Sequence, residues 1–158
     1  MNALGKSIDP KIIRRYSLNC CDLLKDMTTE REFKKSIVLA NKYLSNTICD
    51  SDLLENSNRL KEVFLTHSEK MNDEDKVDNV RLWSLGAAIN LLQTDTSYHS
   101  DGPICAGDPD LDSTWSCACS LVGAYYFDMN EETVLEHVEM AHESMANLLR
   151  AMVPYPFT

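Results

Sequence analysis

Glycine and proline are scarce in this chain, which has only five of each among its 158 residues. Few positions therefore carry the residues that tight turns need. No stretch alternates apolar and polar residues for long enough to predict a strand, whereas apolar residues recur at three- and four-residue spacing, which is typical of amphipathic helices. The sequence predicts an all-α fold, with residues 1–158 as a single domain of about six helices.

Long apolar runs are also missing, and none approaches the roughly 18 residues that a membrane span needs. The first 15 residues hold no apolar core of the length that a secretion signal requires. We therefore expect a cytoplasmic protein without a membrane partner. In that compartment a chain of this length does not need disulfides, so we expect most cysteines to be buried thiols. The six cysteines are Cys20, Cys21, Cys49, Cys105, Cys117 and Cys119.

Positive charge is in short supply, with 15 Lys and Arg against 25 Asp and Glu, a net charge of −10. A nucleic-acid-binding protein needs a basic footprint, so direct nucleic-acid binding is not expected. Residues 1–42 hold nine basic and five acidic residues (+4), whereas residues 43–158 hold six and twenty (−14). The acidic part fits a solvated surface, a surface for a basic partner (including a nucleic-acid mimic), or charge-steered self-association.

The basic N-terminal part contains the first two predicted helices. Asp9 and Pro10 are suited to begin the first helix, whose apolar stripe runs to Met27. A capping box at residues 29–32 predicts the start of the second helix. Arg14-Arg15 and Lys34-Lys35 are expected to be solvated, although such pairs can also bind an anion or an acidic partner.

Four further helices are expected in the acidic part. The third is capped by Asp50 or Ser51 and extends roughly to Met71. The fourth, 77–92, is apolar around most of its circumference from residue 82, which predicts a central position. The fifth follows a cap at Ser113, and the sixth follows a cap at Asn130.

Periodicity stops between the fourth and fifth helices, at residues 94–112. A loop of this length is uncommon in a compact domain, and such loops often carry function. Its acids, flanked by a tryptophan, form the predicted binding surface for a protein partner with a basic surface. The residues of this predicted loop surface are Asp95, Asp101, Asp108, Asp110, Asp112 and Trp115.

Motifs for common enzyme chemistries are missing: there is no Gly-x-Ser-x-Gly, no Walker loop and no Gly-x-Gly-x-x-Gly. Glu139 and His142 have the spacing used in di-iron helix bundles, but a second Glu-x-x-His is lacking. His99 and Cys105 share the irregular 94–112 segment. A metal- or thiol-dependent enzyme using either pair stays an alternative, and we assign no catalytic residue, no metal ligand and no cofactor.

One resemblance rests on RRYSLNCCDLL (14–24), followed by ERE and FKKSIVLANKYLSNTICDSDLLENSNRL. Over residues 12–70 this order resembles a loosely defined group of bacterial all-helical proteins, some of which are identified as immunity proteins of toxin systems. The C-terminal half departs from that group because it lacks Ala-rich helices and has the long loop. The resemblance implies a binding role, such as an inhibitor, rather than catalysis. A structural homo-oligomer, with the basic N-terminal helices against the acidic remainder, is a third alternative.

Overall fold

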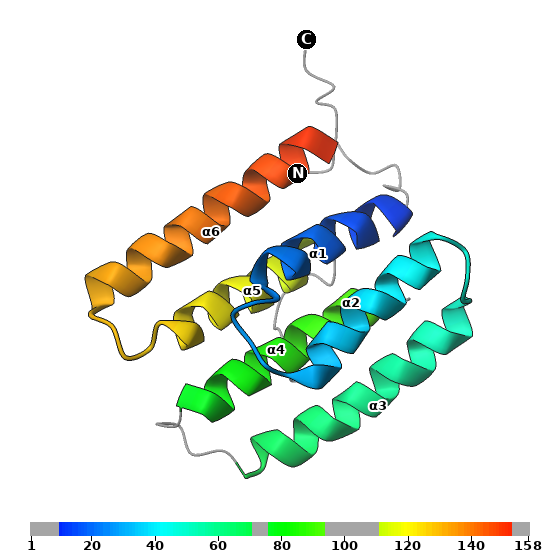
Figure 1. Ribbon diagram of the computed structural model, residues 1–158, viewed down its shortest axis with the longest axis horizontal. Coiled ribbons are helices and arrows are strands. Elements are labelled where there is room, and N and C mark those ends of the chain that lie inside the picture. The colour runs from blue at the N-terminus through cyan, green and yellow to red at the C-terminus, as the bar shows by residue number, and fades with distance from the viewer. Residues whose placement is uncertain (1–9, 71–75, 94–110, 153–158) are drawn as a thin grey trace.

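The computed structural model describes residues 10–70, 76–93 and 111–152, without the side chains of residues 10, 13 and 111–117. These residues form six helices and no strand, which confirms the predicted all-α fold (Figure 1). None of these helices combines the length and the apolar character that crossing a membrane requires. The helices are α1 (Pro10–Leu24), α2 (Arg31–Leu44), α3 (Asp50–Ser68), α4 (Lys76–Leu92), α5 (Leu111–Tyr125) and α6 (Glu131–Met152).

Consecutive helices run in opposite directions, so the array is of the up-and-down type (Figure 1). Four helices, α1, α2, α4 and α5, form its centre. Helix α3 contacts α2 and α4, whereas α6 contacts α1 and α5. The two outer helices therefore lie at opposite edges of the array (Figure 1).

The helix contacts have a two-fold pattern that the sequence, which has no clear internal repeat, did not predict. Exchanging α1, α2 and α3 with α4, α5 and α6 turns every helix–helix contact into another contact that the structure contains. Helices α1 and α4 each contact four others, and the outer helices each contact two. Helices α3 and α6 are thus equivalent in position.

Helix α4 is central, as its apolar circumference predicts. It is buried continuously from Ser84 to Ile89 and again at Leu91 and Leu92. From Ser84 onward the helix is enclosed, because α4 contacts α1, α2, α3 and α5. The core also contains three free thiols, Cys20, Cys21 and Cys119, whereas Cys49 is exposed.

The starts of α2, α3 and α5 differ from the predictions by one to three residues. Glu30, not Thr29, caps α2, because the Thr28 hydroxyl accepts the Glu30 N–H at 3.0 Å and closes a turn that ends there. Helix α5 begins at Leu111, so residues 111 and 112 of the predicted loop are helical, and the Ser113 cap is wrong.

Helix α3 begins after Cys49 rather than after Asp50 or Ser51, and it ends at Ser68. The Cys49 N–H donates to Asp52 Oδ2 at 2.8 Å, so Asp50 falls in the first turn, where the helix dipole favours a carboxylate. The cap of α6 is confirmed, since Asn130 Oδ1 accepts the Thr133 N–H at 2.8 Å.

Arg14 is buried, and the prediction of a solvated side chain is wrong for this residue. Its guanidinium donates to the carbonyl oxygen of Leu91 at 2.6 Å and to that of Gln93, and it lies 4.9 Å from the centre of the Tyr43 ring. Burial lowers the pKa of Arg14. The last carbonyls of a helix lack partners within the helix, so Arg14 caps α4 from α1.

Candidate functional site

The predicted loop surface falls largely outside the described residues. Four of its acids, Asp95, Asp101, Asp108 and Asp110, belong to the 94–110 segment, as do His99 and Cys105. Asp112 and Trp115 lie in the first turns of α5, where side chains are not described. That surface stays a prediction.

The alternative pair on α6 is described. Glu139 is exposed and His142 is half-buried. Within residues 10–70, 76–93 and 111–152, no group of three or more His, Cys, Asp or Glu side chains is placed to hold a metal ion. The described part of the chain therefore adds no third ligand to Glu139 and His142.

The outer face of α6 is strongly acidic. Its inner side packs on the core, and Met145 there is fully buried. Its outer side exposes residues that recur every three or four positions, which places them on one face. We call this the α6 acidic face; its residues are Glu132, Leu135, Glu136, Glu139, Met140 and Glu143.

Charge on α6 is strongly one-sided. The helix holds five glutamates and one arginine, a net charge of −4 with neutral histidines. Ion pairs do form elsewhere, for example between Lys76 Nζ and Asp128 Oδ2 at 2.8 Å. None of the described ion pairs involves a glutamate of α6. The negative charge of the α6 acidic face is therefore uncompensated within the described residues.

These glutamates weaken the helix that carries them. Glu132 and Glu136 are four residues apart, as are Glu139 and Glu143, and Glu136 and Glu139 are three apart. Like charges at these spacings each cost a helix about 0.2–0.5 kcal/mol. Local conflicts of this kind are expected at functional surfaces, because there the sequence serves something besides the fold.

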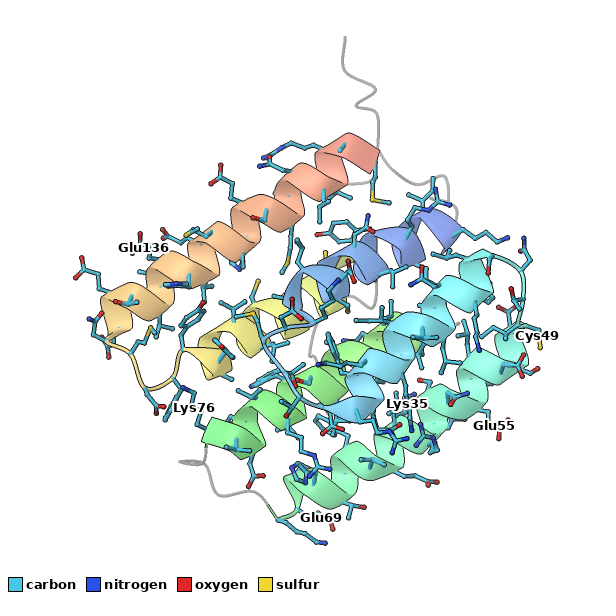
Figure 2. The ribbon with its side chains drawn as sticks, in the orientation of Figure 1. Lys35, Cys49, Glu55, Glu69, Lys76 and Glu136 are labelled. Atoms are coloured by element: carbon cyan, nitrogen blue, oxygen red, sulfur yellow. The ribbon has the colours of Figure 1, made fainter. Side chains whose placement is uncertain are left out.

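Two apolar side chains stand among the acids. Leu135 is 59% exposed and Met140 is 60% exposed, and each neighbours a glutamate one turn away. Figure 2 shows Glu136 on the side of α6 that faces away from α1 and α5. The face thus combines charge, which steers association, with apolar area, which is gained on contact.

The turn before α6 extends the apolar part of this surface. Phe127 and Met129 are about half exposed, at 51% and 49%. The preceding Tyr125 ring lies 6.0 Å from the Lys76 ammonium. Aromatic and methionine side chains are enriched at protein interfaces, so this turn is suited to lie at the end of a contact along α6.

Specific contacts hold α6 in place. The His137 ring stacks on Tyr126, with the ring centres 3.9 Å apart, and His137 Nδ1 lies 2.8 Å from the Thr133 carbonyl oxygen. Near the other end, Asn19 Nδ2 donates to Met152 Sδ at 3.5 Å. The acidic face is therefore presented on a helix fixed near both ends.

The helical spacing of residues 131–152 predicts a solvated polar face opposite an apolar core stripe, and that stripe includes Leu135. The prediction is wrong for Leu135, which is exposed beside Met140 and the glutamates. Both side chains are more exposed than the two large apolar side chains that α3 exposes, Leu54 at 48% and Leu65 at 46%.

No protein-family model, curated protein sequence or solved structure matches this chain. The resemblance of residues 12–70 to immunity proteins therefore stays a prediction. Function has to be inferred from the surface itself.

Proposed function

We propose that this chain is an acidic protein-binding module whose α6 acidic face docks on a basic surface of another protein. The observation that carries the proposal is a single exposed helix face on which four glutamates without ion-pair partners, within the described residues, surround Leu135 and Met140. Charge and apolar area on one helix face are what a partner of opposite charge requires.

The finer role that we propose is that of an inhibitor or immunity-type protein that covers its target's basic surface. An acidic face accelerates association with a basic target, because opposite charges steer the encounter over about a Debye length. We place this role in the cytoplasm. Three free thiols buried in the core suit a reducing compartment.

The test compares three forms of the chain as baits in a lysate of the source cells. One is unaltered, one carries E136K, E139K and E143K, and the third is a matched control. The control reverses three exposed glutamates, of which Glu55 and Glu62 lie on α3 and Glu69 directly follows it; Glu55 and Glu69 are labelled in Figure 2. Both variants change the net charge from −10 by +6, to −4, so only the location differs.

We expect one basic protein to bind the unaltered chain and the α3 variant at about 0.15 M salt, and to elute at about 1 M salt. The α6 variant should bind this protein at least about tenfold more weakly, a loss of about 1.4 kcal/mol. Equal capture by all three baits, or capture by none, would contradict the proposal. Circular dichroism establishes that each variant is folded.

Further variants with an intact α6 test the predicted loop surface separately. Neutralising Asp95, Asp101, Asp108 and Asp110 together should weaken the same complex and flatten its salt dependence, if the loop contributes to the surface. Unchanged affinity would assign the contact to α6 alone.

A further inference from the structure

Helix α2 has an outer face of the opposite charge. Its exposed residues include four basic side chains and Val38, which is 53% exposed. Lys35 Nζ pairs with Glu32 Oε1 at 2.8 Å, whereas no ion pair of the described residues involves the other three. We call this the α2 basic face; its residues are Arg31, Lys34, Lys35, Val38 and Lys42.

The α2 basic face and the α6 acidic face match in length as well as in charge. Residues 31–42 and residues 132–143 each span eleven helical steps, or about 17 Å. Each face has exposed apolar residues between its outermost charges, Val38 on α2 and Leu135 and Met140 on α6. Two such helices can lie side by side with charges paired at both ends and apolar side chains between them.

Within one molecule the two faces do not meet. Helix α2 contacts α1, α3 and α4, whereas α6 contacts α1 and α5. Lys35 and Glu136 lie far apart on different sides of the array (Figure 2). A contact between the faces therefore requires two molecules.

We propose that the α2 basic face of one molecule docks on the α6 acidic face of a second copy. The inference rests on the proposed function, because it uses α6 as the docking surface, and it names an occupant for that surface when no other partner is bound. Each molecule contributes a different face, so the contact is head-to-tail and leaves one free face at each end of a dimer. A basic partner protein then competes with the second copy.

Salt should affect this association in two directions. Each molecule carries a net charge of −10, so two copies repel each other at about 0.01 M salt, where the Debye length is about 30 Å. At about 0.1 M the Debye length is about 10 Å, which screens distant charges more than the touching faces. At about 1 M it is about 3 Å, and the paired charges lose their attraction. Association should peak at intermediate salt.

The experiment is sedimentation velocity on charge-reversed forms of the full chain. One variant carries R31E, K34E and K42E on α2, and the other carries E136K, E139K and E143K on α6. Each alone should be monomeric at about 0.1 M salt, because its two faces then have the same sign. Their equimolar mixture should associate again, because every contact between unlike variants then joins an acidic face to a basic one, and a variant with all six substitutions should associate as the unaltered chain does.

Several outcomes would overturn the inference. An unaltered chain that is monomeric at about 1 mM across this salt range has no such contact. Association that persists in the α2 variant, or that the six-substitution variant fails to restore, would mean that other surfaces are used. The α3 variant E55K, E62K and E69K should associate normally and controls for the net charge of the α6 variant, whereas the six-substitution variant keeps the net charge of −10.

The same variants separate this inference from the proposed function. The α2 variant retains the α6 acidic face, so it should still capture the basic partner protein while failing to self-associate. A monomeric unaltered chain that captures a partner through α6 would overturn the inference alone. An α6 variant that captures the partner normally would overturn the proposed function.

Discussion

Helices α3 and α6 occupy equivalent positions at opposite edges of the array, yet they are attached to it differently. Helix α3 buries Leu53, Ser57, Leu60 and Phe64, whereas α6 buries Met145 alone. Polar contacts also tie α3 to its neighbours, since Arg59 forms an ion pair with Glu32 and His67 Nε2 lies 3.2 Å from Asp78 Oδ1.

The charges on the two outer helices differ in the same sense. Helix α3 has four acidic and two basic residues, a net charge of −2, whereas α6 has a net charge of −4. Helix α3 therefore contributes more to the stability of the fold, whereas the glutamates of α6 have no ion-pair partner among the described residues. A position in a fold does not determine a role; the side chains placed there do.

The largest expected effect tests whether α3 is the more firmly attached helix. Leu60→Ala should lower the free energy of unfolding by about 2–5 kcal/mol, because a fully buried side chain leaves a cavity between α3 and its neighbours. Met145→Ala should fall at the lower end of this range, since α6 contacts fewer buried groups and can close the space. Urea unfolding of both variants measures the difference.

Hydrogen exchange extends that test to single helices. The amides of α6 should exchange through a local opening with a lower free energy than those of α3. Met145→Ala should increase exchange mainly in α6, and Leu60→Ala throughout the core. A larger loss of unfolding free energy for Met145→Ala than for Leu60→Ala would mean that α6, and not α3, is the more firmly attached helix.

The second prediction concerns the contact between Arg14 of α1 and the C-terminal end of α4. Arg14→Ala should lower the free energy of unfolding by about 3 kcal/mol, because the carbonyls of Leu91 and Gln93 lose a charged donor. Arg14→Lys should recover part of the loss, since an ammonium lacks the fork of the guanidinium. Arg15→Ala, an exposed neighbour, should stay within about 0.5 kcal/mol of the unaltered chain. A similar loss in Arg15→Ala would refute the assignment.

Arg14 also marks a limit of prediction from the sequence. Helical periodicity predicted six helices and the central position of α4, because both depend on local spacing and apolar content. The burial of Arg14 depends on the end of α4 lying against α1, a contact between residues about 77 positions apart. No local pattern near residue 14 carries that information.

The candidate site shows the same limit. The glutamates of α6 are visible in the sequence, but an acidic stripe predicts a solvated face as readily as a docking surface. Only the array shows that Leu135 and Met140 stand outside the core beside these acids. The errors at the caps of α2 and α3 have another cause. The side chains of Thr28, Glu30 and Asp52 accept the backbone N–H groups of Glu30, Glu32 and Cys49, and these local hydrogen bonds decide where each helix begins.

The third prediction tests, at the N-terminal end of α6, whether α6 opens more easily than α3. Asn130→Ala should cost about 1 kcal/mol, because the Thr133 N–H loses its acceptor. If α6 opens locally, exchange at the first turns of α6 should rise while α3 is unaffected. Asn130→Asp should retain the cap and serves as the control. Equal increases in exchange in α3 and α6 would argue against local opening.

The smallest expected effect depends on pH and on Glu32, which links α2 to α3. A hydrogen bond from Lys35 and the nearby Arg59 lower the pKa of Glu32. The contribution of Glu32 to stability is therefore complete above its unfolded pKa, about 4.3, and is lost as the pH falls through its lower folded pKa. Glu32→Gln should cost about 0.2–1 kcal/mol at neutral pH, since its partners are exposed.

That cost should shrink between about pH 5 and about pH 3, because protonation removes the same charge from the unaltered chain. Urea unfolding at both limits measures it. Glu136→Gln, on the α6 acidic face, should show no such pH-dependent cost, because no described ion pair involves Glu136. If both substitutions cost the same at every pH, the ion pairs of Glu32 do not stabilise the contact between α2 and α3. Glu32 and Glu136 would then not differ in their contribution to stability.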